Sequence, residues 1–179
     1  MPNDEELMQA AGRGDLLAFE QIVLRHQTEA WSVATRLLGG DATEAEDVAQ
    51  EAFLRILEAS PRYRPTASFR TYLYRIVTNL CLDRAEKKRP VYLDCLPDAA
   101  STDPSPADAL ASRERHEAVR DALETIPPRQ RAAIVLRHFE GLSLQEIASI
   151  MNITPKAVER LLARARSALA LRLKDFLSE

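Results

Sequence analysis

The residues best suited to chemistry lie on the predicted second helix of a tight helical corner near the C-terminus. Counted at 100° per residue from Val158, the outward arc of this helix combines cationic and small side chains. Arginine and lysine donate to guanine or phosphate, glutamate accepts from cytosine N4, and small residues let the backbone approach a duplex. An ordinary amphipathic hairpin with a solvated charged face is the alternative. The candidate DNA contacts are Lys156, Glu159, Arg160 and Arg164.

The corner that positions these residues is marked by local signals. Ser143 and Glu146 have the spacing of a capping box, in which each side chain satisfies the other's free backbone N–H. Asn152 tolerates the left-handed conformation of a short turn, and Thr154-Pro155 is a second helix start. Small Ala148 allows a close crossing. The pattern predicts a helix-turn-helix, whose second helix enters the DNA major groove.

Charge is strongly partitioned along a chain whose net charge is only −3. Residues 1–59 carry 4 basic and 12 acidic side chains, whereas residues 60–90 carry 8 and 2. Residues 91–112 carry 4 acidic side chains and no basic ones, and residues 113–179 carry 12 basic and 9 acidic ones. Two basic blocks separated by an acidic connector indicate two separate contacts with a polyanion.

Helical periodicity dominates the chain, and an all-α fold of two small helical domains is expected. Proline-rich residues 91–112 cannot bury enough apolar surface to order themselves, which predicts a flexible acidic linker between domains 1–90 and 113–179. In the second helix the expected apolar stripe begins at Leu16, and either Asp41 or Thr43 caps the third. Helices are expected at Asp4–Ala11, Asp15–Leu37, Thr43–Glu58, Ser68–Glu86, Arg113–Thr125 and Arg129–Phe139, before the corner.

Composition excludes several classes of protein. No apolar run is long enough to span a bilayer, and the acidic N-terminus is not a signal peptide, so we expect a cytoplasmic protein. Cys81 and Cys95 form no CxxC pattern and the three histidines are scattered, so neither a metal nor a cofactor is expected. Cys81 is expected to pack as a small hydrophobe and Cys95 to be a free thiol.

Several motifs in order resemble the extracytoplasmic-function (ECF) sigma factors, the small members of the sigma-70 family that keep only its second and fourth regions. The resemblance covers nearly the whole chain, and the succession is far more specific than a lone helix-turn-helix. The motifs are Asp47-Val-Ala-Gln-Glu-Ala-Phe-Leu54, Phe69-Arg-Thr-Tyr-Leu-Tyr-Arg-Ile-Val-Thr-Asn79, Ile126-Pro-Pro-Arg-Gln-Arg131, Glu140-Gly-Leu-Ser-Leu-Gln-Glu-Ile-Ala148 and Arg164-Ala-Arg166.

The resemblance implies a non-enzymatic protein that binds core RNA polymerase, directs it to promoters and helps to open the duplex. It implies docking on the clamp helices of the largest polymerase subunit, and contact with the polymerase flap. It also implies control by an anti-sigma factor. The residues that match the clamp-docking segment are Asp47, Gln50, Glu51, Phe53 and Leu54. Without the family, a solvated helix face would explain these carboxylates.

The helix from Ser68 and the loop before it resemble the element that meets minus-ten DNA. Cationic grooves and aromatic stacking, worth roughly 1–3 kcal/mol per base, hold single-stranded DNA. Tyr72 lies on the inward arc and is expected in the core; the family usually has Trp there. The implied minus-ten contacts are Arg62, Tyr63, Arg64, Arg70, Tyr74, Arg75, Asn79, Arg84, Lys87 and Lys88.

The resemblance implies that the helix-turn-helix recognises the minus-35 element. Promoter preference does not transfer, because Ala157-Val-Glu-Arg-Leu161 replaces the commoner Thr-Val-Lys-Ser-Arg. Two other classes remain open on the residues alone: a stand-alone helix-turn-helix regulator with a sensor or dimerisation domain, and a helical adaptor that binds only protein.

Overall fold

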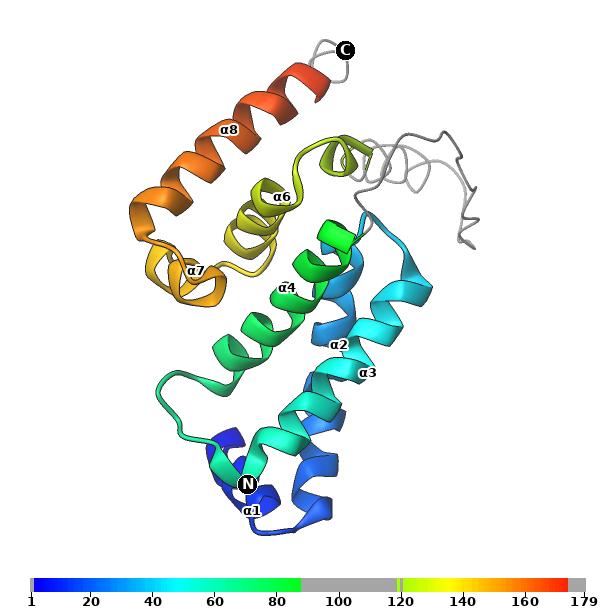
Figure 1. The fold of residues 1–179 in the computed structure, drawn as a ribbon, viewed down its shortest axis with the longest axis vertical. Helices are drawn as coiled ribbons and strands as arrows, with labels where there is room; N and C mark the ends of the chain where they lie inside the picture. The colour runs from blue at the N-terminus through cyan, green and yellow to red at the C-terminus, as the bar shows by residue number, and fades with distance from the viewer. Residues whose placement is uncertain (1, 88–118, 120, 174–179) are drawn as a thin grey trace, which may run out of the picture.

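The computed structural model describes residues 2–87, 119 and 121–173, which form two packed groups of helices (Figure 1). Every regular element in this part of the chain is helical, as the sequence predicts. The first group contains α1 (Asp4–Gly12), α2 (Leu16–Leu37), α3 (Ala42–Ala59), the 3₁₀ turn η1 (Ser60–Arg62) and α4 (Phe69–Lys87). The second contains α6 (Pro128–Ile134), η2 (Val135–Phe139), α7 (Leu144–Met151) and α8 (Pro155–Leu173).

Short polar side chains begin the N-terminal helices. Asn3 accepts from the N–H of Glu6, whose carboxylate returns the bond at 2.9 Å, so α1 has a capping box. Asp15 caps α2, as predicted. Asp41, the first of the two predicted candidates, caps α3. These bonds satisfy helix-end N–H groups that have no partner inside the helix.

The N-terminal domain forms its core where α2 packs between α1, α3 and α4. The predicted inward positions of α3 and α4 are largely confirmed, with Val48, Ile56 and Leu73 fully buried. The prediction that Leu16 joins the apolar stripe of α2 is wrong, since its side chain is 66% exposed. It lies about 120° around the helix from buried Ile22, which sets the inward direction.

The predicted helix Arg129–Phe139 is interrupted. The α-helical part ends at Ile134, and η2 continues it as one wider π-helical turn, in which the N–H of Glu140 donates to the carbonyl of Val135 at 3.2 Å. Single π turns are common at functional positions in helices. Glu140 follows this turn directly, and its carboxylate accepts a hydrogen bond from Tyr74 of the N-terminal domain.

The helical corner forms as the sequence predicts. Ser143 and Glu146 form the capping box, and Asn152 takes the left-handed conformation with φ 51°. The Thr154 hydroxyl accepts from the N–H of Ala157 at 3.2 Å. Val158 is fully buried against α7, while the outward arc of α8 faces solvent. The fold therefore contains a complete helix-turn-helix.

The two domains pack on one another, with α7 and α6 against α4 (Figure 1). Arg131 strengthens the contact, because its guanidinium donates to the carbonyl of Leu37 at 3.1 Å. Gly39 has φ +72°, and a Cβ there would lie 2.7 Å from Glu124 Cγ, so the α2–α3 turn approaches the second domain closely. The predicted linker at 91–112 and the helix start at Arg113 lie outside the described residues.

Candidate nucleic-acid interface

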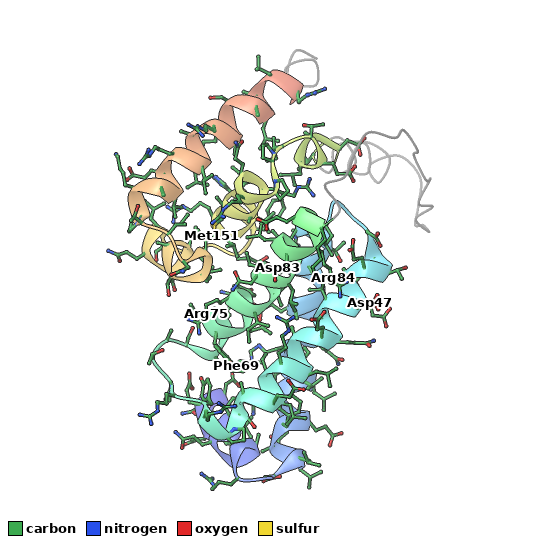
Figure 2. All side chains as sticks on the ribbon, in the orientation of Figure 1. Asp47, Phe69, Arg75, Asp83, Arg84 and Met151 are labelled. Carbon is green, nitrogen blue, oxygen red and sulfur yellow. The ribbon has the colours of Figure 1, made fainter. Side chains whose placement is uncertain are left out.

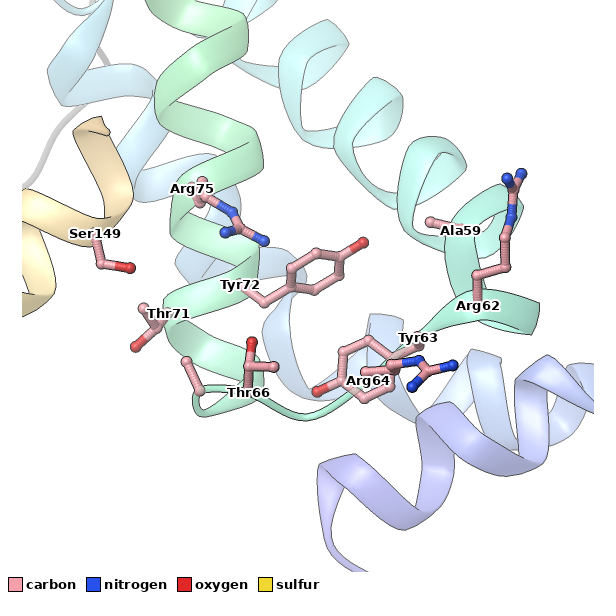
Figure 3. A pocket seen from close by; sticks show the side chains of 10 residues that line it. Ala59, Arg62, Tyr63, Arg64, Thr66, Thr71, Tyr72, Arg75 and Ser149 are labelled. Atoms are coloured by element: carbon pink, nitrogen blue, oxygen red, sulfur yellow. The ribbon is translucent and has the colours of Figure 1, made fainter. Parts of the chain in front are cut away.

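A pocket of about 400 Å³ opens between the η1–α4 loop and the first turns of α4 (Figure 3). Its wall is made of cationic and aromatic side chains, with the hydroxyls of threonine and serine at the edge. Figure 3 shows Arg75 above the ring of Tyr72, Tyr63 below it, and Ser149 of α7 facing the pocket from the other domain. The lining residues include Arg62, Tyr63, Arg64, Thr66, Thr71, Tyr72, Arg75 and Ser149.

Two tyrosines form the aromatic part of this pocket. The rings of Tyr63 and Tyr72 are tilted, with centroids 5.4 Å apart, and the Arg75 guanidinium lies 5.5 Å from the Tyr72 centroid. Burial raises the pKa of Tyr63 to about 12, so the phenol keeps its proton. Its hydroxyl is buried and makes no hydrogen bond within the described part of the chain. A ligand group that reached this hydroxyl would gain a bond that the described chain leaves unmade.

Tyr72 was expected in the core, and its side chain is half-buried. The ring meets Phe69 at a centroid distance of 6.4 Å on one side and lines the pocket on the other. It thus packs against the core and still presents a surface to a ligand.

The predicted minus-ten residues that the structure describes fall into three groups: at the pocket, on the later turns of α4, and between the domains. Arg62, Tyr63, Arg64 and Arg75 meet at the pocket. Asn79 and Lys87 are exposed further along α4, where Figure 2 shows Phe69, Arg75 and Arg84 in succession. Arg84 is tied to Glu51 at 3.0 Å and to the carbonyl of Glu44 at 3.4 Å. Lys88 lies outside the described residues.

Tyr74 and Arg70 form a third group, placed between the domains. The Tyr74 side chain is fully buried, and its hydroxyl lies 2.5 Å from Glu29 Oε1 and 2.6 Å from Glu140 Oε2. Burial and the two carboxylates raise the pKa of Tyr74, so it remains a neutral donor. Arg70 Nε donates to Glu29 at 2.6 Å. In this conformation Tyr74 has no face available for stacking.

Three of the five residues that resemble the polymerase-docking segment line an apolar groove of about 620 Å³ between α2 and α3. Gln50, Phe53 and Leu54 line it, and Leu54 is 61% exposed. Asp47 is exposed on α3 outside the groove (Figure 2). Glu51 points to α4, where its hydrogen bond from Arg84 holds the pKa of the carboxyl below its usual value.

Sequence reasoning missed the α2 side of this groove. Trp31 lines it while 42% exposed, and Leu24 and Leu17 precede it at intervals of seven residues with 62% and 71% exposure. Residues seven apart lie on one helix face, so these side chains form one uncovered apolar stripe. The seven-residue spacing was the signal that could have identified it.

On the second domain, all four predicted DNA contacts are exposed on α8. Lys156 and Glu159 pair at 2.8 Å, so each limits the other's orientation. Arg160 and Arg164 border a shallow hollow of about 300 Å³ with exposed Arg129 from α6. Arg129 was not predicted as a contact; its place directly after Pro127-Pro128, at the start of a helix beside the corner, was the available signal.

Of the two cysteine predictions, the structure tests only the one for Cys81. Cys81 is a buried free thiol in the α4 core, as expected, and burial raises its pKa to about 12. Thiolate chemistry is therefore suppressed at this position. Cys95 lies outside the described residues.

A helical domain with a cationic, aromatic pocket, joined to a helix-turn-helix domain, defines a two-domain DNA-binding protein. Family models agree: "Sigma-70 region 2" matches residues 22–91, and "Sigma-70, region 4" matches residues 116–169. None of the helices in the described part of the chain combines the length and apolar character needed to cross a bilayer.

Relatives extend the match to the whole chain. It is 36% identical over 176 residues to the ECF RNA polymerase sigma factor SigW of Bacillus subtilis (strain 168), covering 91% of this chain and 92% of that protein. It is 33% identical to the RNA polymerase sigma-H factor of Pseudomonas aeruginosa, covering 98% and 96%. The solved structure of CnrH in complex with the cytosolic domain of CnrY matches with a TM-score of 0.71 and 29% identity, covering 96% and 97%.

The chain belongs to the ECF RNA polymerase sigma factors of the sigma-70 family. It is a transcription initiation factor, and the predicted family and all-α fold are confirmed. Because the chain belongs to this family, the two alternative interpretations, a stand-alone regulator and an adaptor that binds only protein, are set aside.

Proposed function

We propose that this sigma factor uses three surfaces of the described chain, one to dock on polymerase and two to recognise the promoter. The groove between α2 and α3 docks on the polymerase clamp helices, the pocket at the start of α4 holds minus-ten DNA, and the outer face of α8 reads the minus-35 element. The pocket carries the proposal, because it gathers arginines, two tyrosine rings and an unpaired buried hydroxyl in one place.

The pocket suits a base removed from the duplex. Unstacking a base costs a few kcal/mol, which a binding pocket must return. Tyr72 offers a ring to stack on, with Arg75 close to it, and the Tyr63 hydroxyl can donate to a base edge. The arginines of the η1–α4 loop hold the adjoining phosphates. Asn79 and Lys87 extend this contact along α4.

Docking on polymerase relies on apolar anchors with a polar rim. Trp31 of α2 and Leu54 of α3 line the groove as exposed large side chains, and Gln50 adds a polar contact. Exposed Asp47 adds negative charge beside them. Buried tryptophans at the centre of an interface commonly dominate its affinity.

For the minus-35 element, Arg160 and Arg164 are the base and phosphate contacts on α8, with Lys156 and Glu159 at the helix start. Arg129 adds a phosphate contact from α6, since it borders the same hollow. The resemblance to the family further supports flap contact, control by an anti-sigma factor and action in the cytoplasm, where polymerase works.

Reconstituted holoenzyme on a promoter of this factor tests the division. We expect Tyr72→Ala and Arg75→Ala to reduce permanganate reactivity of minus-ten thymines, while core binding is kept. Arg160→Ala should weaken binding to a duplex with the minus-35 element, and its defect should shrink on a promoter lacking that element. Equal defects of Arg160→Ala on both promoters, or normal opening with Tyr72→Ala and Arg75→Ala, would contradict the assignment.

A further inference from the structure

Lys156 and Glu159 are bonded to each other on the solvent side of α8. The ammonium of Lys156 lies 2.8 Å from Glu159 Oε2, and the two side chains are 76% and 47% exposed. At about 100° per residue they lie about 60° apart around the helix, and about 160° and 100° from buried Val158. The pair therefore presents a donor and an acceptor side by side to solvent.

The position of this pair along α8 favours contact with bases. The helix begins at Pro155, so Lys156 and Glu159 both lie in its first two turns. In a helix-turn-helix, the N-terminal residues of the second helix contact base edges. Arg164, a turn later, borders the hollow of about 300 Å³ with Arg129 of α6, whereas neither residue of the pair lines it. Arginines placed in this way suit the phosphates of the adjoining strand.

The carboxylate of Glu159 opposes DNA binding unless it has a base to contact. Affinity for the phosphate backbone comes from Lys and Arg side chains that neutralise its charge, and a carboxylate beside them reduces that effect. A base edge offers compensation, because glutamate accepts from the N4 amino group of cytosine. The negative charge of Glu159 is therefore better suited to reading a base than to holding the backbone.

A G·C pair complements the Lys156–Glu159 pair. In the major groove guanine presents two neighbouring acceptors, N7 and O6, and the cytosine amino group lies next to them. Lysine donates to the guanine acceptors while glutamate accepts from cytosine. An A·T pair separates its two acceptors by the adenine amino group, so lysine meets only one of them.

We propose that Lys156 and Glu159 together read one G·C base pair of the minus-35 element, with Lys156 donating to guanine and Glu159 accepting from cytosine. The inference rests on the proposed function of α8 and adds a base identity to it. The two side chains keep their mutual contact in the complex, so they act as one reader. Arg164 and Arg129 supply phosphate contacts that do not depend on sequence.

Two other roles would leave the sequence preference of the protein unchanged. Ion pairs between residues three apart slightly stabilise exposed helices, with no effect on any base. A lysine that held only a phosphate would, when replaced, weaken binding equally for every base pair. A base preference at a single position distinguishes the shared reader from both roles.

Reconstituted holoenzyme is bound to promoter duplexes with a randomised minus-35 region and a fixed minus-ten region, and the bound fraction is sequenced. With the native chain we expect one position at which G·C is preferred about tenfold over A·T. Glu159→Gln and Lys156→Met should each reduce this preference below about threefold at that same position, and the double variant should lose little more. Glu20→Gln, which removes an exposed carboxylate from α2, is the matched control and should keep the native preference.

A variant with the two residues exchanged, Lys156→Glu with Glu159→Lys, keeps an ion pair between the same positions. It moves the donor and the acceptor, so it should no longer favour G·C in the native orientation. Circular dichroism verifies that each variant is folded.

The outcomes separate this inference from the proposed function of α8. The shared reading is overturned by an unchanged preference in either single variant, by losses at two different positions, by uniform weakening with Lys156→Met, or by the native preference in the exchanged variant. If the defect of Arg160→Ala still depends on the minus-35 element in those cases, α8 remains the minus-35 surface. If none of these α8 variants alters binding in a way that depends on the minus-35 sequence, the proposed function of α8 fails as well.

Discussion

Replacing Trp31 tests the proposed polymerase-docking surface. Its side chain is 42% exposed and borders the groove between α2 and α3. A large aromatic side chain has roughly 150–250 Å² to bury, so about 100 Å² of Trp31 remains for a partner to cover. At about 25 cal/mol per Å², this area is worth about 2.5 kcal/mol, or roughly 60-fold in the dissociation constant.

The assay is competition against fluorescently labelled native chain for core polymerase, measured by anisotropy. We expect Trp31→Ala to weaken binding by roughly 60-fold and Trp31→Phe by much less, because the smaller ring keeps most of the apolar area. Leu171→Ala is the control, since it removes a 78% exposed apolar side chain from α8, far from the groove in the sequence and in the other domain. Its binding should change less than about threefold.

A folded Trp31→Ala protein that competes within threefold of the native chain would refute the reasoning. The groove would then be an exposed surface with no part in docking. A loss of equal size for Leu171→Ala would show that exposed apolar area anywhere on the chain contributes, and it would remove the specific role of α2.

Three further outcomes follow from local geometry. Asn152→Ala should lower stability by about 1 kcal/mol and Tm by about 2–4 °C, with Asn152→Gly close to native, because φ 51° disfavours a side chain with Cβ and no local hydrogen bond; equal melting of the two variants would contradict this. Hydrogen bonds from Ser143 lower the pKa of Glu146 from its ordinary value near 4.5, so its stabilising effect is present above that pH and is lost as the pH falls through the folded pKa. Glu146→Gln should flatten this acid limb in chemical unfolding, and an unaltered limb would exclude the cap as its source. Tyr63→Phe should keep or raise Tm while weakening oligonucleotide binding about fivefold, since the unpaired buried hydroxyl stabilises only the complex; a lower Tm with normal binding would reverse that assignment.

The helix-turn-helix was predictable because its determinants are local. The capping box spans four residues, from Ser143 to Glu146, and the left-handed Asn152 lies two residues before the hydroxyl cap at Thr154. Each signal acts within one or two helical turns, so the sequence contains all of it. The buried and exposed arcs of α8 follow from the same periodicity.

Tyr74 was less predictable because its surroundings come from distant parts of the chain. Its position on α4 is about 100° from the core residue Leu73, which favours an exposed aromatic ring. The packing of the second domain on α4 buries it, and its partners Glu29 and Glu140 are 45 and 66 residues away. The periodicity of α4 therefore does not predict that the second domain buries Tyr74.

The π turn at Val135–Phe139 and the exposure of Trp31 could not be predicted from the sequence for the same reason. The π turn adds a residue without a change in hydrophobic pattern, so the stretch reads as one regular helix. Trp31 is an apolar residue on an amphipathic helix, and only the packed structure shows that nothing in the described chain covers it fully. Sequence patterns identify faces, whereas contact between faces is a tertiary property.

Run-off transcription with purified core polymerase tests the central claim most directly. On templates containing promoters of this factor, core polymerase with the native chain should produce discrete transcripts from specific start sites. Core polymerase alone, or with a Trp31→Ala, Leu54→Ala double variant, should produce little above background. Core polymerase that remains unable to initiate at any promoter after the folded native chain is added, with no inhibitor present, would contradict the account.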